Sequence, residues 1–299
     1  MVLALAVYLG TAPASADLIV GDNYETYPVG QLVGNNGSMS GATGNWLGSY
    51  TTVGAAAATN VATGNLSYSG GAINVNGGSP DVTIGGPTSN SVFARQLDQQ
   101  TGTVYFSFLF KPISVAGTED EFLQFMLNDD ADSHFNSAAL ISRVNLEVRN
   151  SGSSNGTSTS AGSQPVVGET YLIVGKAFKT GSTYNRLSMW VNPTSLTETT
   201  PNATSTTDTL TSAFNYFSLR TSQVGTGDLY AFDALRIGTA WNDVVSPINY
   251  AAVPEPSSLL LTGLGLSLAG VRKGRRRVAA GWSRLAAWVR GRRTGTGLS

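Results

Sequence analysis

Two short acidic segments hold the side chains best suited to binding a metal or transferring a proton. In the first, Asp129, Asp130 and Asp132 fall within four residues and offer the carboxylate oxygens that Ca²⁺ prefers. Such a segment can hold Ca²⁺ at the rim of a folded domain. We favour a solvated acidic turn between two strands, because the segment lacks the complete ligand spacing of an EF-hand loop.

The second segment, Glu119-Asp120-Glu121, has the paired carboxylates that glycosidases use for acid and base catalysis. Successive side chains of a β-strand point to opposite faces, so Asp120 would point away from its two neighbours. The segment therefore predicts a charged loop and the start of a strand. A glycoside hydrolase remains an alternative, without an assigned acid.

The chain lacks the residues that most other classes of enzyme use for catalysis. His134 is the single histidine and there is no cysteine, which excludes a multi-histidine metal site, a thiol nucleophile and a disulfide. The glycine-rich stretches are not followed by the Lys-Ser/Thr pair of a phosphate-binding loop. We therefore predict that the protein is not an enzyme and assign no catalytic residue.

Aromatic side chains are the remaining candidates for contact with a ligand. Trp46 and Trp241 could stack on sugar rings, and we take them as the candidate ligand-stacking residues. The alternative for each tryptophan is packing in a hydrophobic core, as we expect for Trp190 on an alternating strand.

The elements that would position these side chains are β-strands. Glycine is abundant, only 12% of the residues are charged, and no long helical periodicity is present, which favours many short strands joined by turns. We predict one all-β domain over residues 17–250. Its clearest predicted strands are 104–110, 121–127, 139–143, 144–149, 170–178, 186–191 and 229–237. Residues 150–165 and 194–211 are predicted to be polar loops.

The first residues have the features of an export signal. Residues 3–9 are apolar, and Ala14 and Ala16 form an Ala-x-Ala cleavage site, so we predict a signal peptide over residues 1–16. No charged residue precedes Asp17, although a signal peptide usually begins with positive charge. A first strand of the domain is the alternative.

The last fifty residues combine a stiff tetrapeptide, an apolar run and a basic cluster. Prolines fix the backbone of the tetrapeptide Val253, Pro254, Glu255, Pro256 in an extended form. Residues 259–271 are apolar and predict a single transmembrane helix of marginal length. The cations that follow predict a cytoplasmic membrane stop, and they are Arg272, Lys273, Arg275, Arg276 and Arg277.

The charges divide between the two parts of the chain. Residues 17–253 contain 9 lysines and arginines against 18 aspartates and glutamates, a net charge of −9, whereas residues 257–299 contain 9 basic residues and no acid. An acidic exported body argues against binding to nucleic acid, because phosphate binding needs a cationic face.

Residues 253–277 resemble the PEP-CTERM sorting domain of exported bacterial proteins, since they contain its three elements in the same order. The resemblance implies that an exosortase-type membrane protease cuts near the Pro-Glu-Pro motif. The protein would be anchored transiently in the inner membrane and then reach the cell surface or the extracellular space. Residues 278–299 follow the basic cluster, and the motif does not require these residues. They could form a basic interfacial helix or a read-through end.

Several segments of the body resemble LamG-like (concanavalin A-like) jelly-roll domains. They are 22–30, 104–110, 171–176 with 187–193, and 232–238 with Trp241 and Val244. The resemblance implies a two-sheet antiparallel jelly-roll sandwich. We expect a non-enzymatic component of the envelope or extracellular matrix that binds polysaccharide, with a Ca²⁺-dependent lectin-like module as an alternative.

Overall fold

The computed structural model describes residues 18–25, 27–32, 42–44, 46–54, 58–79, 81–86, 90–116, 122–131, 137–142, 145–150, 158–162, 164–206 and 211–247. The chain divides into two compact units, residues 1–247 and residues 248–299. The predicted signal peptide, the Pro-Glu-Pro motif, the apolar run and the basic residues after it all lie outside the described residues. No helix in the described ranges has the length and apolar character needed to span a membrane.

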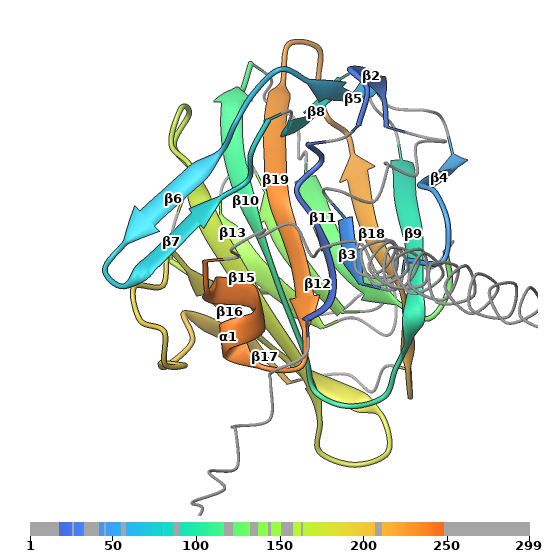
Figure 1. Cartoon of the computed structure of the whole chain (residues 1–299), viewed down its shortest axis with the longest axis vertical. Helices are drawn as coiled ribbons and strands as arrows, with labels where there is room; N and C mark the ends of the chain where they lie inside the picture. The colour runs from blue at the N-terminus through green and yellow to red at the C-terminus, as the bar shows by residue number, and fades with distance from the viewer. Residues whose placement is uncertain are drawn as a thin grey trace, which may run out of the picture. The chain divides into compact units, whose positions relative to one another are not determined.

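The described part of the first unit is built mainly from two antiparallel sheets (Figure 1). The first sheet has ten strands in the order β17-β16-β15-β10-β19-β8-β5-β2, and β1 pairs with both β19 and β3. Its strands are β1 (Leu18–Asp22), β2 (Gly30–Gln31), β3 (Ala42–Gly44), β5 (Ala58–Ala62), β8 (Asp81–Gly85), β10 (Val104–Ser114), β15 (Tyr171–Lys179), β16 (Tyr184–Val191), β17 (Ala203–Ser205) and β19 (Leu229–Gly238).

The second sheet has seven strands in the order β14-β13-β12-β11-β18-β9-β4. They are β4 (Thr51–Gly54), β9 (Asn90–Gln100), β11 (Phe122–Asn128), β12 (Ser137–Ser142), β13 (Leu146–Asn150), β14 (Ser158–Ser160) and β18 (Phe214–Ser222). The all-β, two-sheet antiparallel sandwich predicted from the sequence is therefore confirmed. The predicted polar loops are interrupted by two short strands, β14 and β17, at the ends of the sheets.

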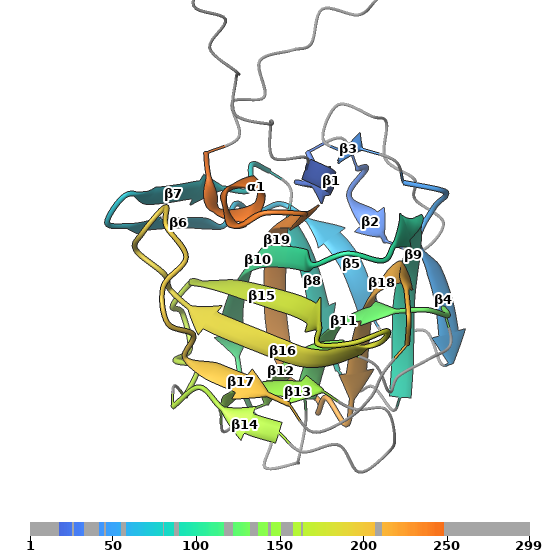
Figure 2. The ribbon, with the colours of Figure 1, turned by 90° about the horizontal axis from the view of Figure 1, so that it is seen from below.

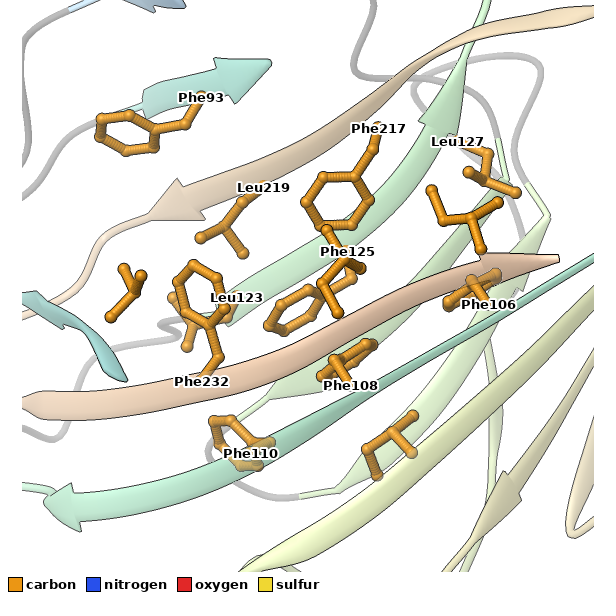
Figure 3. Packing of buried hydrophobic residues seen from close by; sticks show 14 of the residues in the cluster. Phe93, Phe106, Phe108, Phe110, Leu123, Phe125, Leu127, Phe217, Leu219 and Phe232 are labelled. Carbon is orange, nitrogen blue, oxygen red and sulfur yellow. The ribbon is translucent and has the colours of Figure 1, made fainter. Parts of the chain in front are cut away.

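The core lies between the two sheets and is rich in aromatic rings (Figure 3). Alternate residues of a strand point to the same face, so Phe106, Phe108 and Phe110 all project from β10 into the core. The ring of Phe125 comes from β11 of the opposite sheet and stacks on Phe108 with a centroid distance of 3.6 Å. Such rings bury large apolar areas, which explains how a chain without disulfides builds a stable sandwich.

A third layer covers part of the first sheet on the side away from this core. The hairpin of β6 (Ser67–Gly70) and β7 (Ile73–Asn76) lies there with the short helix α1 (Trp241–Val245), above β19, β10 and β15 (Figure 2). Trp190 and Trp241 meet edge to face in this layer at 5.0 Å. The layer and the outer side of the first sheet enclose a second, smaller core. In Figure 2 the layer lies against the first sheet.

Candidate functional site

The structure does not gather the side chains predicted to bind Ca²⁺ into a described site. Asp129 and Asp130 lie in an exposed turn directly after β11, and the backbone oxygen of Asp129 accepts a 3.4 Å hydrogen bond from Asn215. Asp132 lies outside the described residues, as do Glu119, Asp120, Glu121 and His134. Among the residues that the structure describes, no three acidic or histidine side chains lie close enough together to hold a metal ion.

The two tryptophans proposed as sugar-stacking residues each contact other parts of the protein. Trp241 is only 6% exposed in the layer outside the first sheet, and its indole N–H donates to the carbonyl of Ser195. Trp46 is half-buried, donates its indole N–H to the Gly21 carbonyl, and has the Arg95 guanidinium over its ring at 4.5 Å. Trp241 in particular packs the fold and does not present an open ring to solvent.

The outer face of the second sheet, meaning the face turned away from the core, carries mainly polar side chains. Leu123, Phe125 and Leu127 of β11 point into the core, so the residues between them point outward. Strand pairing places their neighbours on the same outer face. The described polar members that are partly exposed are Gln96, Glu147, Arg149, Tyr216 and Arg220, whereas Gln124, Asn128 and Ser218 are buried.

Two arginines dominate the electrostatics of this face. Arg220 on β18 donates from Nη1 to the side-chain oxygen of its cross-strand neighbour Gln124 at 3.3 Å. Burial lowers the pKa of Arg220, and the positive charge of Arg149 on β13 lowers it further. Arg149 and Arg220 are partly exposed, whereas Gln124 and Met126 between their strands are buried. The hydrogen bond to Gln124 therefore holds Arg220 against β11.

Beneath this face, an ion pair inside the sandwich joins the two sheets. Arg95 on β9 donates from Nη1 to Asp22 Oδ2 on β1 at 2.7 Å, and the two residues are 3% and 0% exposed. The Tyr27 hydroxyl donates to the same carboxylate oxygen at 2.6 Å, and Arg95 Nε donates to the Gly48 carbonyl at 2.9 Å. Burial raises the pKa of Asp22 to about 6, because desolvation outweighs the attraction of Arg95. The side chains of Asp22, Tyr27 and Arg95 are all buried, so we assign the network a structural role.

Two further buried acids lie on the outer side of the first sheet. Asp233 is 0% exposed and accepts hydrogen bonds from the backbone N–H of Ala234 and of Leu66. Burial raises its pKa well above the ordinary value, and repulsion by Asp81 and Asp22 adds to this. Burial also raises the pKa of Asp81. A Cβ on Gly77 would overlap the Asp233 carboxylate, so this position requires glycine.

These acids predict that the domain is more stable at pH 5 than at pH 7. An acid whose pKa is higher in the folded state binds its proton more tightly there, so its contribution is present at low pH and is lost as pH rises through the folded pKa. Asp22 alone, with a pKa raised from 3.8 to about 6, contributes about 1 kcal/mol between pH 7 and pH 5. Asp233 and Asp81 act in the same direction.

Urea unfolding of the full chain at both pH values measures this difference. The matched variant is Asp233→Asn, which removes one titrating group and is expected to reduce the pH dependence. A lower unfolding free energy at pH 5 than at pH 7 would show that these buried acids do not control the acid response.

A comparison with protein-family models finds a known sorting motif near the end of the chain. Residues 252–277 match the PEP-CTERM protein-sorting motif. The PEP-CTERM motif implies export and sorting to the cell surface with processing by an exosortase. A search of curated proteins found no match.

Several solved structures are similar to the sandwich at low identity. Domain 4 of an extracellular arabinanase from Geobacillus stearothermophilus, in complex with arabinotriose, matches at 16% identity with a TM-score of 0.43, over 75% of this chain and 92% of that chain. The endo-β-1,4-glucuronan lyase of Trichoderma reesei matches at 12% identity with a TM-score of 0.40, over 62% and 92%. The Emp47p carbohydrate recognition domain matches at 11% with a TM-score of 0.40, over 76% and 98%. These scores lie below 0.5, and no ligand is assigned from them.

Sequence reasoning missed the two arginines of the outer face. Their signal was present, because residues 146–150 alternate cleanly and place Glu147 and Arg149 on one side of a strand. Arg220 alternates with Leu219 in the same way. Neither segment by itself indicates that the two strands belong to one sheet, with β12 and β11 between them.

Proposed function

We propose that this protein is an exported, non-enzymatic component of the cell envelope or extracellular matrix that binds polysaccharide through a LamG-like jelly-roll sandwich. The observation that carries the proposal is the PEP-CTERM motif at residues 252–277, because it directs the chain to the place where polysaccharide is found. After export, an exosortase cuts near Pro254, Glu255 and Pro256. The cut frees the sandwich from the apolar run and the basic cluster.

The outer face of the second sheet supports the binding part of the proposal. Its partly exposed members include the Gln96 amide, the Tyr216 hydroxyl and the Arg220 guanidinium group, which donate or accept hydrogen bonds in the way that sugar hydroxyls require. The outer side of the first sheet is less suited to this role because the β6–β7 hairpin and α1 occupy it. We therefore place polysaccharide on the second sheet.

A binding panel tests this function directly. The full chain, purified in mild detergent, is titrated with laminarin, xylan, arabinan and polygalacturonate, with Ca²⁺ and with a chelator. The same samples are assayed for new reducing ends and for unsaturated sugar products. We expect saturable binding without product. Product formation would make the protein an enzyme, and loss of binding with chelator would favour the Ca²⁺-dependent lectin-like module.

A further inference from the structure

Two buried acids on the outer side of the first sheet have no positively charged partner in contact with them. Asp233 on β19 is 0% exposed and Asp81 on β8 is 5% exposed. In the described ranges, no ion pair joins either carboxylate to a lysine or an arginine, and Lys111 acts on Asp81 only as a nearby charge. An ionised carboxylate is costly to bury alone, so the two acids need a compensating charge or a proton.

The strand register brings the two acids together. Val82 on β8 pairs with Phe232 on β19, and the next position along each strand holds an acid, Asp81 or Asp233. Because Val82 and Phe232 point into the main core, both acids point to the outer face. Side chains at facing positions of antiparallel strands have Cβ atoms about 5 Å apart. One ion can therefore contact both carboxylates.

A short loop lies against both carboxylates. Leu66 donates its backbone N–H to Asp233 Oδ2 at 3.4 Å. Two residues earlier in the chain, a Cβ on Gly64 would overlap the Asp81 carboxylate. Gly77 donates its N–H to the Leu66 carbonyl at 3.0 Å and likewise has no room for a Cβ beside Asp233. Because glycine has no side chain, main-chain oxygen atoms of these segments come close to the two acids.

A third polar side chain is buried next to the acids. Asn23 is 0% exposed, and its amide nitrogen has no hydrogen-bond partner among the described residues. Asp22 pairs with Leu235 and points into the core. Asn23 therefore lies on the outer side, at the position that faces Ala234, the neighbour of Asp233. A buried donor without a partner is costly, and a water molecule bound to a cation would accept its hydrogen bond.

The chemistry of these donors favours Ca²⁺. This ion takes roughly six to eight oxygen ligands from carboxylates, main-chain carbonyls and water, in a flexible geometry. Mg²⁺ demands a tighter octahedral geometry and keeps more of its water. Glu25 is exposed on the same side, since a Cβ on Gly78 would overlap its side chain, and the exported body carries a net charge of −9. Both features attract cations to this part of the surface.

We infer that Asp81 and Asp233 bind one Ca²⁺ together with main-chain oxygens of residues 64–66. The site uses two carboxylates rather than three acids, and it is separate from the exposed turn at Asp129 and Asp130. The ion connects the chain just before the β6–β7 hairpin to β8 and β19, so it stabilises the layer outside the first sheet. The inference is independent of the proposed function. The pH dependence predicted above belongs to the chain without Ca²⁺.

Calcium binding and its effect on stability test the site. The full chain in mild detergent is treated with a chelator, dialysed and titrated with CaCl₂ in a calorimeter. We expect one ion per chain with a Kd of about 10⁻⁴ M, as in other extracellular calcium sites. Because the ion binds only the folded chain, about 2 mM Ca²⁺ should raise the thermal unfolding midpoint by about 5 °C over its value in chelator.

Matched variants locate the ion. Asp81→Asn and Asp233→Asn keep the side-chain size and remove one charge, so each should weaken Ca²⁺ binding at least tenfold and abolish the rise in midpoint. In chelator, each should unfold at or above the parent midpoint, because a buried repulsion is removed. This comparison separates loss of the site from loss of the fold. The control, Asp129→Asn with Asp130→Asn, removes two exposed acids and should leave Ca²⁺ affinity unchanged.

Three outcomes would overturn the site. The first is a parent chain that binds no Ca²⁺ and unfolds at the same temperature with Ca²⁺ and with chelator. The second is binding that survives Asp81→Asn and Asp233→Asn but is lost in the control variant, which would place the ion at the turn after β11. The third is an equal rise in midpoint with Mg²⁺, which would show general attraction of divalent cations to an acidic body. Each of these results leaves polysaccharide binding to be judged by its own panel.

Discussion

Replacing Arg95 with methionine is expected to lower the free energy of unfolding by about 4 kcal/mol. The substitution keeps most of the side-chain volume but leaves the Asp22 carboxylate fully buried without its 2.7 Å ionic partner. Breaking a buried pair by removing one partner typically costs about 3 to 5 kcal/mol, because the remaining charge is uncompensated. The loss also removes the hydrogen bond to Gly48 and the contact with the Trp46 ring.

Denaturant unfolding followed by tryptophan fluorescence measures this effect. The double variant Asp22→Asn, Arg95→Met should recover part of the lost stability, since it removes the stranded charge. Arg186→Met is the matched control, because Arg186 is exposed, and its effect should stay within about 0.5 kcal/mol. A loss below about 1 kcal/mol for Arg95→Met would show that water reaches Asp22 and that the pair is not closed off.

The strands that could be predicted from the sequence are those rich in apolar residues, above all at the positions that face the main core. β10, β11, β15, β16 and β19 were all found close to their observed bounds. In each of these strands the residues that face the main core are apolar, so the pattern of the chain and the geometry of the strand agree.

Two central strands of the second sheet, β9 and β18, were missed. In β9, the core-facing positions are Phe93, Arg95 and Leu97, and a charged residue at the middle position hides the alternation. The cause is the ion pair itself, because Arg95 can face the core only with Asp22 opposite, 73 residues earlier in the chain. In β18, a shift of register between Phe214 and Tyr216 breaks the regular spacing.

The candidate site could not be predicted because it depends on strand order rather than on any local motif. Arg149 and Arg220 belong to strands that do not pair with each other. The acidic residues that did form local clusters proved less informative, since Asp129 and Asp130 are exposed in a turn. For this fold, residues that are near in sequence marked a turn, whereas strand order placed Arg149 and Arg220 on one face of the second sheet.

Replacing Pro254, Glu255 and Pro256 together with alanine is expected to abolish release of the sandwich from the cell. Two prolines hold the motif extended, and alanines would let the helix of the following apolar run extend backward through it. The exosortase would then lose both the side chains and the exposed backbone that it cuts. Immunoblots of membrane and medium fractions from the producing bacterium, with an antibody against the sandwich, measure the change.

Released protein should fall at least tenfold while the full-length chain accumulates in the membrane. Pro247→Ala removes a proline just ahead of the matched residues 252–277 and is expected to leave release unchanged, which separates the motif from a general effect of proline loss. Mass spectrometry of the released parent protein should give a C-terminus that precedes the basic cluster. A released chain that still contains Arg272–Arg277 would contradict cleavage at the motif and would place the anchor elsewhere.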